Sequence, residues 1–322
     1  MSNIGVIGAG AFGTALASVL ASGGNTVTLW GRNAEQMQRI DKMHQTPYLP
    51  EITLPDRLRG TCDLSDLSGS DIVLMVVPAQ ATRSVLQAEN FAAINCPILM
   101  CAKGIELESG LSQTDILKQE LPQCVTGAIS GPGFAGEIAN GKPTALTLGV
   151  ENADLGAKLQ KMLSTPTMRM YLSDDLKGVQ LGGALKNVYA IACGIVRGAG
   201  LGESAQAALL TRGFAELTTL ATKMGAKPET LSGLSGFGDL VLSCTSPQSR
   251  NYSFGYQVGT VADFGQTKTV EGIATALAVG ALADQYKVEM PICAAVSAVL
   301  QKQLSVQDAL RQLMSRPLKR EV

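Results

Sequence analysis

Histidine is almost missing from this chain, and its scarcity excludes several kinds of active site. One residue of 322 is histidine, His44, in the polar stretch DKMHQTPYLP. The seven cysteines are scattered and form no C-x-x-C pair, so we expect most of them to be buried free thiols. With so few ligands and bases, neither a zinc centre nor a Ser-His-Asp triad has enough parts. We therefore expect no metal ion.

The chain also lacks a surplus of charge and a long apolar run. Its formal net charge is −1, and only 16% of its residues are charged. Without a basic stripe, neither nucleic acid nor an anionic membrane surface is the expected partner. No apolar run approaches the roughly 18 residues of a membrane-spanning helix, and MSN leads into a strand rather than a signal peptide. We expect a cytoplasmic protein that acts on a small molecule.

What the chain does contain is a regular alternation of apolar strands and helices. Its hydrophobic content of 46% is ample for two domains, each with its own core. The opening SNIGVIGAGAFGTALASVLASGGNTVTLWGRN predicts a strand at Ile4–Ile7, a helix at Phe12–Ser22 and a strand at Thr26–Trp30. These three elements form one βαβ unit.

Three glycines between the first strand and its helix follow the G-x-G-x-x-G spacing of dinucleotide-binding turns. Gly8 permits the tight turn, Gly10 lets the backbone approach a pyrophosphate, and Gly13 packs the helix on the strand. The free amides at the start of the helix would face the phosphates. A glycine-rich turn that serves only packing is the alternative, but the flanking strand and helix favour a bound dinucleotide.

The second strand ends in Trp30-Gly31-Arg32-Asn33, where proteins that prefer NAD commonly carry an acidic residue. Arg32 suits the 2′-phosphate of NADPH, so we favour NADPH over NADH. The alternative is an exposed arginine that stacks on adenine and ignores the phosphate.

The rest of the chain divides into a sheet part and a helical part. Strands are predicted at 71–78, 97–104, 124–132, 143–150 and 167–172, and helices at 81–87, 112–121 and 154–163. Beyond them the strand signals stop, and helices are predicted at 176–196, 204–225, 274–287, 292–301 and 305–315. We therefore predict a Rossmann-type doubly wound sheet as a dinucleotide-binding domain (1–175), followed by an all-α substrate-binding domain (176–322). The ligand crevice should lie between them, at the carboxyl ends of the strands.

Two turns after predicted strands could supply polar groups to that crevice. CAKGIE places Lys103 just past a buried strand, although a surface lysine in a turn would have the same sequence. ISGPGFAGE offers the backbone amides of Gly131, Gly133 and Ala135 to oxygen atoms of a ligand. A plain turn between a strand and a helix is the alternative.

A third polar stretch, SGFGDLVLSCTSPQSRNYSFG, is predicted to be a loop between helices. The triplet Ser249-Arg250-Asn251 combines a hydroxyl, a planar cation and an amide, which suits a phosphate ester. Asp239 and Ser243 lie earlier in the same stretch. The alternative is a capping loop with a surface arginine.

Lys186 is unusual because it interrupts the small, apolar helical run GVQLGGALKNVYAIACGIV. A buried ammonium needs a partner or a chemical task. Oxidation of an alcohol by a nicotinamide requires a general base, histidine is effectively absent, and no tyrosine has a lysine four positions later. Lys186 is then the candidate, with a pKa lowered by burial and by a cation such as Lys103. The alternative is an ion pair that braces the two domains.

Two glycines, Gly182 and Gly183, precede this lysine in the same helical run. They should permit close approach to the cofactor or a partner helix.

Seven motifs follow one another along the chain: GAGAFGTALA, WGRN, CAKGIE, ISGPGFAGEIA, GVQLGGALKNVYAI, GLSGFGDLVLSCTSPQSRN and TVEG. In order and spacing they resemble the motifs of bacterial NAD(P)-dependent glycerol-3-phosphate dehydrogenases. The resemblance covers essentially the whole chain. It implies reversible reduction of dihydroxyacetone phosphate to sn-glycerol 3-phosphate, which supplies phospholipid synthesis.

The resemblance also implies roles for individual residues. Lys186 would donate and accept the proton, with Lys103 and Asp239 beside it. The implied substrate-binding residues are Lys103, Gly131, Gly133, Lys186, Asp239, Ser249, Arg250 and Asn251. The implied cofactor-binding residues are Gly8, Gly10, Ala11, Phe12, Gly13, Arg32, Lys103, Ala135, Arg250, Thr269 and Glu271.

Two positions depart from the family pattern. Gly133 stands where threonine or serine is usual, so only its amide is left for a contact, and Ala11 stands where serine is common.

Two other functions remain open: a different hydroxyacid or phospho-alcohol dehydrogenase of the same plan, and a non-catalytic dinucleotide sensor. The serine-arginine-asparagine triplet argues against the first, and the number of converging polar groups argues against the second. Apolar helices such as ATALAVGALA could form a homodimer surface, although core packing explains them as well.

Overall fold

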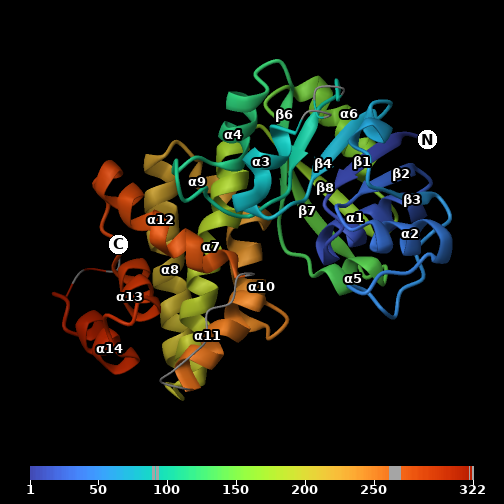
Figure 1. Ribbon diagram of the computed structural model, residues 1–322. Coiled ribbons are helices and arrows are strands. Elements are labelled where there is room, and N and C mark those ends of the chain that lie inside the picture. Colours follow the sequence, from blue (N-terminus) through green and yellow to red (C-terminus); the bar gives the residue numbers. More distant parts are fainter. Residues whose placement is uncertain (89–90, 92–93, 261–269, 319, 321–322) are drawn as a thin grey trace.

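The computed structural model describes residues 1–88, 91, 94–260, 270–318 and 320. Figure 1 shows a sheet flanked by helices, from blue to green, beside a set of helices from yellow to red. The eight strands follow the order β3-β2-β1-β4-β5-β6-β7-β8. The first six strands have the Rossmann order, whose switch point lies between β1 and β4.

The strands of the sheet occupy the N-terminal half of the chain. Their bounds are β1 Asn3–Ile7, β2 Thr26–Trp30, β3 Leu58–Thr61, β4 Ile72–Met75, β5 Ile98–Met100, β6 Thr126–Ser130, β7 Thr144–Gly149 and β8 Met168–Ser173. Neighbouring strands pair in parallel except β6 and β7, which are antiparallel. All the predicted strands are present. The strand β3 was not predicted, because the edge segment LRGT is short and has no continuous apolar run.

The sheet is buried on both faces, as its continuous apolar strands predict. In β4, Leu74 packs in one apolar cluster, whereas Val73 and Met75 pack in the cluster on the opposite face. Helices cover these faces: α1 Ala11–Ser22, α2 Ala34–Met43, α3 Thr82–Leu86, α4 Gln113–Glu120, α5 Ala135–Ala139 and α6 Ala153–Leu163. Asn33, Ser112 and Asn152 cap α2, α4 and α6 with their side-chain oxygens.

The C-terminal half is helical throughout its described residues. Its elements are α7 Leu176–Gly198, α8 Glu203–Lys223, α9 Pro228–Leu231, the π-helix η4 Leu234–Gly238, α10 Asp239–Thr245, α11 Arg250–Thr260, α12 Glu271–Tyr286, α13 Pro291–Leu300 and α14 Val306–Met314. The five long predicted helices are all present. The prediction of a loop at 235–255 was wrong, because η4, α10 and the start of α11 occupy most of it. Packing against α7 overrides the weak helical preference of its glycines and serines.

Helix α7 is the central element of the helical half. Twenty of its 23 residues are buried, and α8, α10, α11 and α12 all pack against it. By length and composition it could cross a membrane, but 94% of its most apolar window is buried inside the protein. The expectation that no apolar run is long enough was therefore wrong for this segment. Its apolar residues serve the core.

Glycines bring α7 and α11 unusually close together. A Cβ atom at Gly194 would lie 2.1 Å from the carbonyl oxygen of Tyr252, and one at Gly255 would lie 2.1 Å from that of Ile191. Gly198 and Gly259 make equivalent approaches one turn further along. The spacing Gly-x-x-x-Gly in both helices lets the backbones meet directly, as in other small-residue helix pairs. This contact places the start of α11 beside the middle of α7.

We expect Gly255→Ala to destabilise the protein, because its new methyl group would overlap the backbone of α7. The free energy of unfolding should fall by about 1–3 kcal/mol, the usual range for overpacking. Gly280→Ala is the matched control: Gly280 is also helical, and no described atom lies within 4 Å of a Cβ built there. That substitution should stabilise the helix by up to about 1 kcal/mol. Thermal unfolding of both variants tests this, and equal melting temperatures would contradict the close packing.

Candidate active site

The glycine turn after β1 has one closed end and one open position. Gly8 has a φ of +117°, and a Cβ there would lie 2.6 Å from the carbonyl oxygen of Val76. A Cβ at Gly13 would lie 1.9 Å from the carbonyl oxygen of Gly8. By contrast, no described atom lies within 4 Å of a Cβ built on Gly10. Gly8 and Gly13 are therefore required by packing, whereas Gly10 faces open space.

The open position lies at the start of a helix whose first amides have no side-chain cap. Gly10 is the N-cap of α1, and no described side chain accepts a hydrogen bond from the helix there. Ala11 and Phe12 form the first turn and are half-buried. Uncapped amides, a helix dipole and an open approach suit an anionic phosphate group. The turn therefore fits a dinucleotide pyrophosphate.

The end of β2 lies next to this turn. Gly31 packs closely against Ala9, because a Cβ built on Gly31 would lie 2.9 Å from the Cβ of Ala9. Gln36 donates a 2.6 Å hydrogen bond to the carbonyl of Ala9. Arg32 is exposed, and Asn33 caps α2. An exposed guanidinium at this edge is available to a ligand that lies over the glycine turn.

A carboxylate shared by two lysines joins the two halves of the protein. Asp239 is the first residue of α10, and its Oδ1 lies 2.9 Å from Lys186 Nζ in α7. Its Oδ2 lies 2.6 Å from Lys103 Nζ, in the turn after β5. Ser243, one turn further along α10, accepts a 2.5 Å hydrogen bond from Lys186. The exposed fractions of the side chains are 2% for Asp239 and 8% for Lys186, so this is a buried charge cluster.

The cluster shifts the pKa of two of its members. Burial lowers the pKa of the Lys186 ammonium, and the nearby charge of Lys103 adds to this effect, whereas Asp239 opposes it. Burial alone would raise the pKa of Asp239, but the two ammonium groups outweigh it and hold that pKa below its ordinary value. Lys186 therefore gives up its proton more easily than a solvated lysine, while Asp239 stays ionised.

Lys103 also connects this cluster to the glycine turn and to the turn after β6. Its Nζ donates a 2.9 Å hydrogen bond to the carbonyl of Gly131 and lies 5.8 Å from the ring centre of Phe12. Gly131 has a φ of +140°, a conformation that favours glycine. Two residues further on, a Cβ at Gly133 would lie 3.0 Å from Ile138, so this position is tight. Ala135 begins α5 and is half-buried.

Asparagine side chains form a second connection, which joins the predicted residue Asn251 to Asn187, a residue that the predicted site did not include. Asn187 Nδ2 donates to the carbonyl of Lys103 at 3.2 Å, and its Oδ1 accepts from Asn251 Nδ2 at 3.0 Å. Asn251 Oδ1 in turn accepts from the amide of Gly272 at 2.9 Å. The pair Lys186-Asn187 is visible in the sequence, but nothing local indicates that its amide holds another segment.

The remaining predicted residues lie around the start of α11 and α12. Ser249 is buried and accepts a 3.3 Å hydrogen bond from the amide of Tyr252, and Arg250 is exposed. Burial raises the pKa of Glu271, and the charges of Arg250, Lys103 and Lys186 oppose the rise. These four groups therefore share one electrostatic environment. Thr269 lies outside the described residues.

The double glycine before Lys186 permits close packing, as predicted, against protein segments. A Cβ at Gly182 would lie 2.8 Å from the carbonyl oxygen of Ser235 in η4, and one at Gly183 would lie 2.4 Å from the hydroxyl of Ser130. These contacts hold α7 against η4, which leads into Asp239, and against β6, which leads into Gly131.

A cavity of about 810 Å³ lies elsewhere, between α8, α10 and α11. Its lining includes Arg197, Glu203, Tyr252 and Tyr256, but none of the predicted site residues. Within the described part of the chain, no three metal-ligating side chains gather in a set that could hold a metal ion. The converging charges therefore mark the candidate site better than the cavity does.

Comparison with known proteins gives matches over nearly the whole chain. Family models described as the N-terminus and the C-terminus of NAD-dependent glycerol-3-phosphate dehydrogenase match residues 3–156 and 175–311. A protein of Roseobacter denitrificans named glycerol-3-phosphate dehydrogenase [NAD(P)+] is 48% identical, covering 99% of this chain and 100% of its own. One of Hyphomonas neptunium with the same name is 47% identical, covering 98% and 96%.

Solved structures agree with these matches. The crystal structure of glycerol-3-phosphate dehydrogenase from Coxiella burnetii has a TM-score of 0.89 and 36% identity, and the alignment covers 98% of this chain and 99% of that one. A D-mandelate dehydrogenase complex with NADH has a TM-score of 0.60 and 19% identity over 94% and 98% of the two chains. This second similarity shows only that the fold is shared.

Proposed function

The chain belongs to the NAD-dependent glycerol-3-phosphate dehydrogenase family, and we propose that its buried lysine-aspartate cluster is the catalytic centre of that reaction. The protein reversibly reduces dihydroxyacetone phosphate to sn-glycerol 3-phosphate with NAD(P)H. The observation that carries the proposed site is the contact of Lys103 and Lys186 with opposite oxygens of Asp239. It joins the turn after β5 to the two helices that carry Lys186 and Asp239, at the place where a crevice between the halves is expected.

The residues present fit a nicotinamide dinucleotide. The open position at Gly10 and the uncapped amides of Ala11 and Phe12 would hold its pyrophosphate. Arg32 would contact the adenosine end, and Ala135, Arg250, Glu271 and Lys103 would line the other end. Gly8 and Gly13 shape the turn that would receive the pyrophosphate. Thr269 is kept as a proposed cofactor residue from the resemblance alone, outside the described residues. When bound, the nicotinamide supplies or receives the hydride.

Lys186 holds the proton that the reaction moves. In the reducing direction its ammonium donates a proton to the carbonyl oxygen of the substrate as the alcohol forms. In the oxidising direction the neutral amine takes that proton back. A lowered pKa makes both protonation states accessible, because the ideal pKa of an acid-base group lies near the working pH. Ionised Asp239 stabilises the ammonium form and orients it, together with Ser243.

The start of α11 provides the binding site for the substrate phosphate. Arg250 is exposed at the first turn, and its planar guanidinium suits a phosphate ester. Ser249 and Asn251 flank it, and Asn251 is held in place by Asn187 and Gly272. Gly131 and Gly133 would approach the substrate from the opposite side through their backbones.

Four further features of the protein are part of this proposal. Its product supplies phospholipid synthesis, and the protein acts in the cytoplasm. The chain divides into a dinucleotide-binding domain (1–175) and a substrate-binding domain (176–322), since β8 ends at Ser173 and α7 begins at Leu176. We also propose a homodimer that forms through the helical domain, with Leu277 on α12, which is 41% exposed, as one residue at the contact.

Oxidation of NADPH or NADH at 340 nm in the presence of dihydroxyacetone phosphate tests the function. We expect rapid oxidation with the phosphate ester and at least about 100-fold less with dihydroxyacetone, because a lost charged contact costs several kcal/mol.

The variant Lys186→Ala should lose turnover by at least about 100-fold and keep its affinity for NADPH, measured by fluorescence. Normal turnover in this variant would remove Lys186 from the mechanism, and no oxidation by the wild type would contradict the function.

The pH dependence of glycerol 3-phosphate oxidation tests the state of Lys186. The initial-rate kcat/KM should rise with pH as the ammonium loses its proton, with a midpoint below the ordinary lysine pKa of 10.5. Asp239→Asn should move this midpoint to lower pH, because the lost carboxylate no longer stabilises the ammonium. A midpoint that stays in place or rises would show that another group titrates.

Arg32→Ala tests the preference for NADPH. We expect its KM for NADPH to rise by about 10-fold, as for loss of a charge-assisted hydrogen bond, with little change for NADH. Arg57→Ala is the control, because Arg57 is exposed just before β3, at the amino edge of the sheet. If the ratio of the two KM values is preserved in the Arg32 variant, the 2′-phosphate is recognised elsewhere.

A further inference from the structure

The segment between β5 and α4 carries Lys103 and is held at each of four consecutive carbonyl groups. Asn187 Nδ2 donates to Lys103 at 3.2 Å, Gln113 Nε2 to Gly104 at 3.2 Å, Gln80 Nε2 to Ile105 at 2.7 Å, and the amide of Gly110 to Glu106 at 2.9 Å. A Cβ at Gly104 would lie 2.7 Å from that of Ala79, so the segment has little room to shift. Residues 103–112 are called the lysine segment below.

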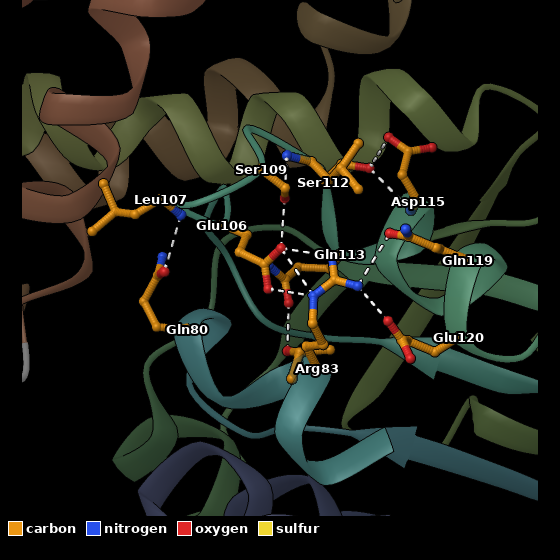
Figure 2. A network of polar contacts seen from close by, with 12 residues as sticks. Gln80, Arg83, Glu106, Leu107, Ser109, Ser112, Gln113, Asp115, Gln119 and Glu120 are labelled. Carbon is orange, nitrogen blue, oxygen red and sulfur yellow. Dashed lines mark hydrogen bonds and ion pairs between the residues drawn. The ribbon is translucent and has the colours of Figure 1, made fainter. Parts of the chain in front are cut away.

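An arginine on α3 anchors the lysine segment through Glu106. The Nε of Arg83 lies 3.0 Å from one carboxylate oxygen of Glu106, and its Nη2 lies 2.7 Å from the other. Figure 2 shows the guanidinium between this carboxylate and two side chains of α4, Gln119 and Glu120. The second Glu106 oxygen also accepts a 2.5 Å hydrogen bond from Ser109. The planar fork of Arg83 thus ties the lysine segment to both helices.

Burial makes this ion pair different from the surface pairs of the protein. The side chain of Glu106 is 9% exposed and that of Arg83 is 24% exposed. The hydrogen bonds from Arg83 lower the pKa of Glu106, so its carboxylate stays charged. Without the arginine, a nearly buried carboxylate would be left without its cation, which is much costlier than the loss of an exposed pair.

The lysine segment also reaches the helical half of the protein. Ile105 is 1% exposed and belongs to the apolar cluster of α7, α11 and α12. Its neighbour Glu106 is held on the sheet side by Arg83 of α3, which also contacts α4. Movement at Glu106 would therefore be transmitted over three residues to Lys103, whose Nζ must reach both Gly131 and Asp239.

We propose that Arg83 is a positioning residue for the reaction. Through Glu106 it fixes the lysine segment and hence the place of the Lys103 ammonium against Asp239. The inference rests on the proposed function only where activity is the readout, because the anchoring itself is a property of the fold. Arg83 contacts neither Lys103 nor Asp239 through any described hydrogen bond, so it acts through the segment.

A double-mutant cycle between Arg83 and Lys103 tests the coupling. Arg83→Met should lower kcat/KM for dihydroxyacetone phosphate by about 10–100-fold, the usual cost of a misplaced active-site group. In a Lys103→Met background the same change should cost less than about 3-fold, because the group it positions is already gone. Arg83→Lys keeps the charge but lacks the bidentate fork and should give an intermediate loss. It also serves as the test if Arg83→Met does not fold.

Arg59→Met is the control for loss of an exposed arginine in the same half of the protein. Arg59 forms a 3.8 Å pair with Asp41, with 72% of its side chain exposed, and its replacement should leave kcat/KM unchanged in both backgrounds. If Arg83→Met lowered kcat/KM by the same factor in both backgrounds, Arg83 would contribute only to the general stability of the protein, and the proposal would be overturned. No loss in the wild-type background would also overturn the proposal.

Hydrogen exchange of the amides in 103–112, read by mass spectrometry, tests the anchoring independently of catalysis. Exchange should accelerate in the Arg83 variants and stay unchanged in Arg59→Met. Unchanged exchange in the Arg83 variants would overturn the proposal even if their activity falls. If the wild type does not reduce dihydroxyacetone phosphate, the proposed function fails, and accelerated exchange would still support the anchoring role of Arg83.

Discussion

The contact of the Asp239 carboxylate with two lysines is the interaction on which the rest of the candidate site depends. One buried anion contacts two ammonium groups, one from the sheet half of the protein and one from the helical half. Two buried cations close to each other would be unfavourable without it, since each loses hydration and each repels the other. The same carboxylate opposes the lowering of the Lys186 pKa by burial and by Lys103, and it balances the charge of both ammonium groups. In the proposed reaction, structural bracing and proton transfer depend on the same group, so the bracing interpretation of Lys186 does not compete with the proposed catalytic one.

Close helix packing places that carboxylate. Gly182 lets η4 lie against α7 just before α10 begins at Asp239, and the glycine pairs of α7 and α11 bring Asn251 beside Asn187. A larger side chain at these glycines would separate the helices and move polar groups that must meet within hydrogen-bond distance. The apolar character of α7, which resembles that of a membrane-spanning segment, follows from its position at the centre of this packing.

Elements whose stability comes from distant contacts have no clear signal in the sequence. The stretch 235–255 is rich in glycine and serine and was predicted to be a loop, yet it forms η4, α10 and the start of α11 against α7. The edge strand β3 was missed because four residues with two polar side chains carry little periodicity. Asn187 was not among the predicted site residues, because its side chain holds a segment 84 residues away in the chain.

The sequence by itself determined seven of the eight strands, the long helices, the glycine turn after β1 and the presence of a lysine in an apolar helix. Each of these depends on local spacing, because strand and helix periodicity and the backbone freedom of glycine act over a few residues. The family resemblance implied that Lys103 and Asp239 lie beside Lys186, but only the tertiary structure decided that both ammonium groups contact one carboxylate. Asp239 is 53 residues from Lys186 and 136 residues from Lys103 in the chain. Charge pairing acts through space over a few ångströms, so the partners depend on how the two halves pack and not on their order in the chain.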